Sequence, residues 1–278
     1  MRISSSVFVL LFLIGGASAQ TKGIATFGGL KNLEFINGYY NGGTGSMGSG
    51  PGKDLHLGFT TNAQAIVSAS KGGTGNFIND PGGYPVMFFA SGSSVTVNAV
   101  AGISTGMWFS YSALQPGTVT IYDGLNGMGN VLGTINLVPN NVGCTGYKMC
   151  IWSPVAFPLT ATVSSIRFSG TANQIAIGAI HVGVKIPTFM GLSSSVNPSV
   201  QGQPVTFTAA VSATGTAPVG SVRFKAGNAV LGEVPVSSGT ASLTSSTLPV
   251  GSTKILAIFR GTGFVTSTAT IVQTVNPN

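Results

Sequence analysis

Apolar and polar residues alternate in short runs along the chain, most regularly after residue 186. This period of two is typical of half-buried β-strands. Glycine or proline interrupts the pattern every few residues, and no stretch has the spacing of an amphipathic helix. The pattern therefore predicts an all-β protein. The core-facing positions expected in its last part are Val205, Phe207, Ala209, Val211, Val222, Phe224, Ala241, Leu243, Ile255, Ala257 and Phe259.

The strand series changes near residues 185–188, and a chain of 278 residues has room for two domains. Short strands at a spacing of roughly 8–12 residues suggest an immunoglobulin-type sandwich for the second part. We expect a jelly-roll-like β-sandwich over residues 20–186 and an Ig-like β-sandwich over residues 187–278.

Five segments of the second part carry a specific resemblance. They are residues 197–208 (NPSVQGQPVTFT), 218–224 (PVGSVRF), 230–232 (VLG), 248–251 (LPVG) and 271–276 (IVQTVN). Together they resemble the group 3 bacterial Ig-like repeat. The resemblance implies a spacer or adhesion module without catalytic residues. The family usually has an acidic residue after the glycine that follows the sixth strand, whereas here Gly261 precedes Thr262.

The first part shows a less specific resemblance, in residues 39–43 (YYNGG) and 122–127 (YDGLNG). These phrases are similar to the secreted β-sandwich domain of bacterial proteins that carry a C-terminal PEP sorting signal. Most members of that family have no assigned function.

The first 19 residues have the layout of a secretory signal peptide. Arg2 is followed by an apolar run at residues 7–14, which is too short for a membrane-spanning helix, and by small residues ending at Ala19. We therefore expect cleavage after Ala19, no membrane span in the mature chain, and a secreted or cell-surface location in bacteria.

Charged residues make up 6% of the chain, with 12 lysines and arginines against five acids. Ordinary soluble domains contain about a quarter charged residues. The cations are spread singly along the sequence and show no basic stripe, so we expect no nucleic-acid partner.

Cys144 and Cys150 lie six positions apart. In an exported protein such a close pair predicts a disulfide. The alternative is a metal or redox site, which needs further ligands or a C-x-x-C spacing.

Too few acid–base groups are present to favour catalysis, and no Gly-x-Ser-x-Gly elbow occurs. We expect no enzyme activity. The open alternative is a glycan-active hydrolase built on Glu34, Asp54 and Asp80, since glycosidases need two carboxyl groups across the sugar. His181 is expected to project from the final strand of the first domain.

Calcium is the cofactor that the oxygen-bearing side chains of the first domain suit best, because it takes carboxylate, amide and carbonyl oxygens. Glu34, Asn37, Asp54 and Asn76 are the candidate ligands. The alternative is that these are solvated loop residues without a metal.

Aromatic residues in the first domain offer a platform for a sugar. Tyr39, Tyr40 and Tyr147 flank glycine-rich or cysteine-closed loops and are the candidate ligand-binding residues. Trp108 and Tyr111 lie in a strand-like run and are expected in the core or at a strand edge. We predict a non-catalytic, secreted or cell-surface binding or adhesion protein. Its first sandwich recognises carbohydrate, and its Ig-like domain acts as a spacer or docking module. The expected partners are extracellular polysaccharide or cell-surface proteins. The alternative is a purely structural surface or matrix protein, which the apolar Leu256 and Ile258 favour because exposed apolar strands invite pairing.

Overall fold

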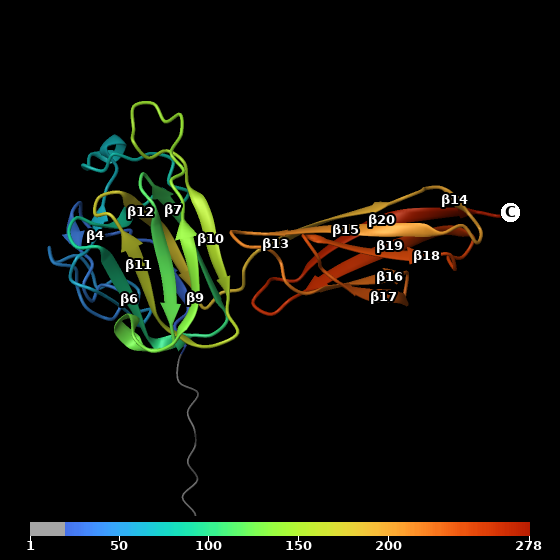
Figure 1. Ribbon diagram of the computed structural model, residues 1–278, viewed down its shortest axis with the longest axis horizontal. Helices are drawn as coiled ribbons and strands as arrows, with labels where there is room; N and C mark the ends of the chain where they lie inside the picture. Colours follow the sequence, from blue (N-terminus) through green and yellow to red (C-terminus); the bar gives the residue numbers. More distant parts are fainter. Residues whose placement is uncertain (1–19) are drawn as a thin grey trace, which may run out of the picture.

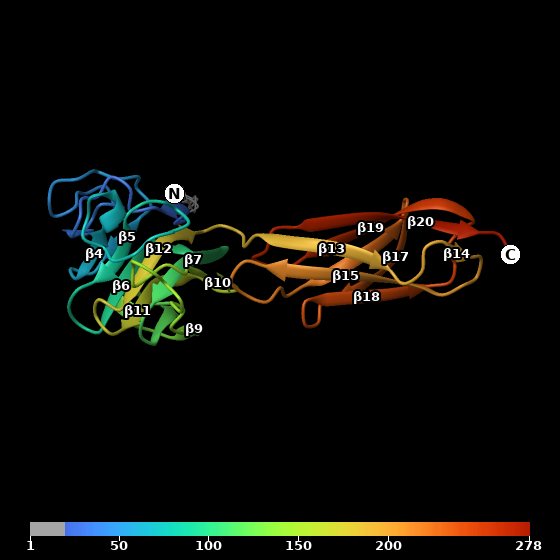
Figure 2. The same cartoon turned by 90° about the horizontal axis from the view of Figure 1, so that it is seen from above.

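The computed structural model describes residues 20–278, so the predicted signal peptide lies outside the described residues. Twenty strands and two single-turn 3-10 helices, η1 (Ala69–Lys71) and η2 (Leu125–Gly127), make up the regular structure. The prediction of an all-β sandwich fold is confirmed. The strands form two sandwiches placed end to end, with the C terminus at the far end of the second (Figures 1 and 2). No helix in residues 20–278 is long and apolar enough to cross a membrane.

The N-terminal sandwich consists of a seven-stranded and a five-stranded sheet whose neighbouring strands are antiparallel. The first sheet has the order β10-β7-β12-β5-β4-β2, with β1 also paired to β12, and the second has the order β3-β6-β11-β8-β9. The strands of the seven-stranded sheet are β1 (Gly23–Ala25), β2 (Glu34–Phe35), β4 (Ala63–Ile66), β5 (Val86–Phe89), β7 (Gly106–Ala113), β10 (Ser153–Pro158) and β12 (Ile175–Val182). Those of the five-stranded sheet are β3 (Leu57–Phe59), β6 (Ser94–Ile103), β8 (Gly117–Tyr122), β9 (Val131–Leu137) and β11 (Val163–Gly170).

The two inner faces of this sandwich form one apolar core. Phe109 of β7 and Phe168 of β11 meet edge to face with ring centroids 5.1 Å apart, which joins the two sheets. Along β7, Met107, Phe109 and Tyr111 point into this core, so Trp108 and Ser110 point outward. The outer face of the seven-stranded sheet therefore carries side chains that the N-terminal core does not use, and Trp108 packs partly against the C-terminal core.

The C-terminal sandwich packs a three-stranded sheet, β13-β15-β18, against a five-stranded sheet, β14-β20-β19-β16-β17. Its core contains Phe207, Phe224 and Phe259, and the alternation predicted after residue 186 places its residues there, except that Leu243 is only partly buried. The strands are β13 (Thr188–Ser194), β14 (Ser199–Val200), β15 (Val205–Ala213), β16 (Ser221–Ala226), β17 (Ala229–Pro235), β18 (Thr240–Ser245), β19 (Gly251–Arg260) and β20 (Ser267–Asn276).

The two sandwiches are joined by a closely packed junction with backbone hydrogen bonds between them. Ile186 N–H donates to the carbonyl of Gly263 at 2.8 Å, and Ala156 N–H of β10 donates to the carbonyl of Gly215 at 3.2 Å. A Cβ at Gly215 would lie 2.8 Å from the backbone of Val155, so a side chain has no space there. Ala156 packs in the C-terminal core, as does Ile186, the last residue of the domain predicted as 20–186. The boundary after residue 186 stays a prediction.

Candidate functional site

A groove of about 570 Å³ lies on the outer face of the seven-stranded sheet. Its floor is formed by β7 and β12, and its walls by β1, the segment before β5 and the residues that lead into β10. We call it the outer-face groove. The residues that supply its aromatic and polar groups are Thr26, Tyr84, Trp108, Ser110, Trp152 and His181.

Trp108 and His181 form the centre of the groove floor because β7 and β12 pair in antiparallel register with these two residues opposite each other. Their rings stack face to face, with centroids 3.5 Å apart and planes inclined by 13°. Burial lowers the pKa of His181 to about 4. The imidazole is therefore neutral at pH 7, and the stacked pair presents an uncharged aromatic surface.

Two further aromatic residues line the groove. Tyr84 is 49% exposed. Trp152 is half-buried, and its indole N–H donates to the carbonyl of Ile78 at 2.9 Å, which fixes the orientation of the ring. Both tryptophans of the chain therefore lie in this groove.

Asp80 lies behind the groove, close to Ser110. An added Cβ at Gly178 would lie 2.4 Å from Ser110 Oγ and 2.8 Å from Asp80 Oδ1, so β12 needs glycine here. Within residues 20–278, Asp80 Oδ1 is buried and has no hydrogen-bond partner. Burial raises the pKa of Asp80, opposed by the backbone N–H groups of Tyr84, Gly83 and Gly82.

The surface position expected for Tyr39 and Tyr40 is wrong. Both rings are buried in the N-terminal core, at 7% and 3% exposure. The Tyr40 hydroxyl accepts a hydrogen bond from Phe27 N–H at 2.6 Å, and burial raises the pKa of Tyr40 to about 12. The glycine-rich loop covers these rings, since an added Cβ at Gly50 or Gly52 would overlap the Tyr39 ring. Neither tyrosine offers a face to a ligand.

The predicted disulfide is confirmed between Cys144 and Cys150, whose Cα atoms are 5.7 Å apart. Tyr147, in the loop that this disulfide closes, is half-buried and does not line the outer-face groove. Asn141 holds the loop in place, because its Oδ1 accepts from Cys150 N–H at 2.8 Å and its Nδ2 donates to Ser112 Oγ at 2.8 Å.

Glu34, one of the four predicted calcium ligands, is buried, and both of its carboxylate oxygens accept hydrogen bonds from protein donors. Its carboxylate accepts from Lys31 N–H at 2.7 Å, Met47 N–H at 2.9 Å, Ser49 N–H at 3.1 Å and Ser49 Oγ at 2.6 Å. Burial alone would raise the pKa of Glu34, but the hydrogen bonds outweigh it and leave the pKa below its ordinary value. The residue acts as an internal cap for the loop that contains Ser49.

The other three predicted calcium ligands are exposed, and the hydrogen bonds that they make do not bring them together. Asp54 Oδ1 accepts from His56 N–H at 2.9 Å, and Asn76 Oδ1 accepts from Lys148 N–H at 2.7 Å. Asn37 is an exposed residue in the left-handed region, with φ of 48°. Within residues 20–278, no group of three His, Cys, Asp or Glu side chains is arranged to hold a metal ion. The calcium site stays a prediction that this geometry does not support.

The strand pairs of the C-terminal sandwich are antiparallel, except that β14 pairs with β20 in parallel. Residues 192–276 match the bacterial Ig-like domain (group 3) family. The predicted C-terminal resemblance is thereby confirmed, and we refer to this sandwich as the Ig-like domain. The resemblance proposed for the N-terminal sandwich stays a prediction.

Several solved structures show weak similarity to this chain. One is the Endo-D glycoside hydrolase domain from Streptococcus pneumoniae R6, with 12% identity, a TM-score of 0.30, and coverage of 90% of this chain and 43% of that one. The fibronectin(III)-like modules of Clostridium thermocellum CbhA match at 11% identity and a TM-score of 0.30, with 67% of this chain and 87% of that one covered. A Ruminococcus gnavus beta-glucuronidase matches at 11% identity and a TM-score of 0.25, with 67% and 39% covered. These similarities are too weak to transfer a function. No curated protein matches the sequence significantly.

The outer-face groove was not predicted from the sequence. Tyr111 lies in the N-terminal core as expected, whereas Trp108 points away from that core, lines the groove and packs partly against the C-terminal core. His181 does project from the last strand of the N-terminal sandwich. The sequence signal for the groove was that Trp108 and Ser110 alternate with the core residues of β7 and therefore share its opposite face. The partner that completes it, His181, lies 73 positions later and is found only through the strand register.

Proposed function

We propose that the chain is a non-catalytic extracellular protein that binds carbohydrate in the outer-face groove, with the Ig-like domain as its spacer or docking module. The observation that carries the proposal is the stacked Trp108–His181 pair on the floor of a groove also lined by Tyr84 and Trp152. Aromatic rings present broad apolar faces with polar edges, which suits the C–H faces of a sugar ring. A few polar groups among apolar walls then orient the ligand, here Ser110 and Thr26.

The positions of the acids support a binding role over hydrolysis. Glu34 is saturated by protein donors and Asp54 contacts His56. The hydrogen bonds also leave the pKa of Glu34 below its ordinary value, which does not suit the general acid of a glycosidase. The disulfide and the Ig-like domain support an extracellular location.

The two tryptophans provide the test, since both lie in the groove and their fluorescence reports on a bound sugar. The mature chain would be titrated with neutral gluco-, manno-, galacto- and xylo-oligosaccharides. Tyr84→Ala should weaken the binding of the best ligand by about tenfold, as expected for the loss of one aromatic contact. Trp108→Ala should weaken it at least as much.

Tyr147→Ala is the matched control because it removes an aromatic ring outside the groove and should leave the affinity unchanged. Equal losses in Tyr84→Ala and Tyr147→Ala would contradict the assignment of the groove. A failure of every oligosaccharide to change the fluorescence or to release heat would contradict carbohydrate binding itself.

A further inference from the structure

All four cations that follow residue 186 lie on one face of the Ig-like domain. Antiparallel pairing sets Arg223 of β16 opposite Ile258 of β19, and Lys225 opposite Leu256. Because Val222, Phe224, Ile255, Ala257 and Phe259 fill the core, the alternate residues of both strands point to the outer face of the five-stranded sheet. Lys254 and Arg260 therefore share this face with Arg223 and Lys225. We call this surface the cationic face.

The four side chains form a continuous stripe. Arg260 and Arg223 are diagonal neighbours across β19 and β16, as are Lys225 and Lys254, and diagonal neighbours in a sheet are about 7–8 Å apart. From Lys254 to Arg260 the stripe extends about 20 Å along the strand. Leu256 and Ile258 are half-buried between the cations.

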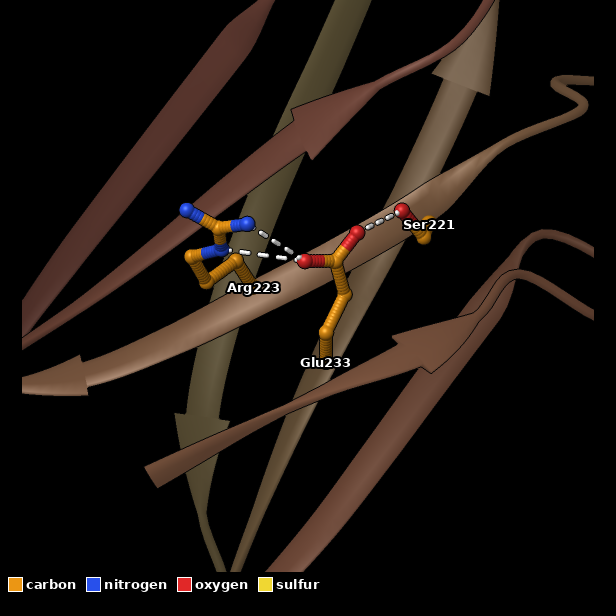
Figure 3. Close-up of polar contacts among 3 residues, drawn as sticks. All are labelled: Ser221, Arg223 and Glu233. Carbon is orange, nitrogen blue, oxygen red and sulfur yellow. Dashed lines mark hydrogen bonds and ion pairs between the residues drawn. The ribbon is translucent and has the colours of Figure 1, made fainter. Parts of the chain in front are cut away.

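A single carboxylate opposes this charge. Glu233 of β17 accepts from Arg223 Nε and Nη2, each at 2.9 Å, and from Ser221 Oγ at 2.5 Å (Figure 3). The hydrogen bonds from Ser221 and Arg223, with the nearby charges of Arg223 and Arg260, lower the pKa of Glu233. Glu233 is the only acid after residue 186. Lys225, Lys254 and Arg260 have no ion-pair partner within residues 20–278.

The cations are concentrated on one side of the domain. The three strands of the other sheet, β13, β15 and β18, contain no charged residue at all. A charge distribution of this kind attracts a polyanion to one face only. Next to the stripe, β20 presents the exposed hydroxyls of Thr268 and Thr270, which add neutral hydrogen-bonding groups.

We infer that the cationic face binds an acidic polysaccharide, a chain bearing carboxylate or sulfate groups, along the direction of β16 and β19. Lysine and arginine would neutralise its anionic groups while the threonine hydroxyls contact its hydroxyls. Nucleic acid suits the face less well, because its outward positions on β16, β17, β19 and β20 contain no aromatic residue for base stacking. The surface is also a flat sheet without an element that could enter a groove of duplex DNA. This inference does not depend on the outer-face groove, which lies on the other sandwich.

The test measures binding of the mature chain, residues 20–278, to polygalacturonate and heparin over a range of salt concentrations, with dextran as the uncharged reference. The variant Lys225→Gln/Lys254→Gln/Arg260→Gln should bind at least about tenfold more weakly and with a flatter salt dependence. The matched control Lys22→Gln/Lys53→Gln/Lys148→Gln removes the same charge from exposed positions of the N-terminal sandwich. It should bind as the unaltered chain does. Equal unfolding midpoints of both variants would show that the substitutions leave the fold intact.

Three outcomes overturn the inference. One is the absence of binding to either acidic polysaccharide at low salt. A second is an equal loss in both triple variants, which would mean that only the net charge matters. The third is tighter binding of duplex or single-stranded DNA than of polysaccharide, with the same dependence on Lys225, Lys254 and Arg260, which would reassign the face to nucleic acid.

Discussion

The indole of Trp108 lies flat on the imidazole of His181, with ring centroids 3.5 Å apart, on the solvent side of a sheet whose other side is a packed core. The stack places two rings at the floor of the outer-face groove. Its burial also makes the pKa of His181 differ between the folded and the unfolded chain. Protonating His181 would put a charge in a partly buried aromatic environment, which is why its pKa falls to about 4.

The stability of the N-terminal sandwich should fall as the pH drops from about 6.5 to about 4. In this window the unfolded chain binds a proton at His181 and the folded chain does not, so the free energy of unfolding decreases with decreasing pH. Comparing unfolding midpoints of the natural chain and His181→Phe over this range isolates the effect. The natural chain should lose stability relative to His181→Phe as the pH falls from about 6.5 to about 4, and this relative loss should level off below pH 4. Parallel pH profiles for the two proteins would contradict the lowered pKa.

Replacing Glu34 by glutamine should destabilise the N-terminal sandwich by about 2–3 kcal/mol. Its carboxylate accepts four hydrogen bonds, and an amide cannot accept all of them, which leaves buried N–H groups of the loop without a partner. Denaturant unfolding would measure the loss. Glu233→Gln, an exposed acid in the Ig-like domain, serves as the control and should leave the N-terminal transition unchanged.

Calcium and a chelator should give the same unfolding midpoint. A ligand that binds only the folded state stabilises it by about 2.7 kcal/mol at a hundred times its dissociation constant. Here Glu34 is saturated by protein donors and Asn76 accepts from Lys148. A calcium-dependent rise of the midpoint would restore the metal site expected from the sequence.

Removing the disulfide should cost less than removing the asparagine beside it. Closing a loop as short as that between Cys144 and Cys150 stabilises a fold by about 2 kcal/mol in the chain-entropy model. Asn141→Ala leaves the N–H groups of Cys150 and Ile151 and the hydroxyl of Ser112 without their partner, and should cost about 3 kcal/mol. Calorimetry of Cys144→Ser/Cys150→Ser and of Asn141→Ala would measure both losses of stability. A larger loss in the cysteine variant would contradict the role of Asn141 in holding the loop.

Placing a methyl group at Gly215 should loosen the junction between the sandwiches without unfolding either of them. Gly215 has φ of 68°, and an added Cβ would lie 2.8 Å from the backbone of Pro154 and Val155. Gly227, with φ of 56° and open space around it, is the matched control. Small-angle scattering should show a broader range of shapes for Gly215→Ala than for Gly227→Ala, and limited proteolysis should cut between the sandwiches. Identical behaviour of the two variants would show that the junction tolerates the side chain.

Local patterns predicted the fold well. The alternation from Val205 to Val211 correctly predicted which side chains of β15 are buried. A few residues suffice for this, because successive side chains of a strand point to opposite faces. The disulfide was likewise readable from the spacing of Cys144 and Cys150. The surface position predicted for Tyr39 and Tyr40 is wrong because a glycine-rich sequence need not form an open loop. Here Gly50 and Gly52 have no side chains, so the loop packs directly on the Tyr39 ring.

Neither proposed binding surface was readable from the sequence, for one physical reason. The Trp108–His181 stack depends on which strands pair and in which register, and these residues are far apart in the chain. The cationic face joins Arg223 to Arg260 in the same way, although the cations are scattered singly in the sequence. The register between strands that are distant in the chain depends on the packing of whole sheets, so it cannot be predicted from a local sequence pattern.

The junction restricts how relatives of this protein can diverge. An added Cβ at Gly215 would lie 2.8 Å from the backbone of Pro154 and Val155, and one at Gly263 would lie 3.1 Å from the carbonyl oxygen of Thr105. A relative that keeps this joint therefore needs glycine at position 215 and has little space for a side chain at position 263, whatever its ligand is. Tyr84 of the outer-face groove lies at neither contact, so substitution there can change the ligand preference while the joint is retained.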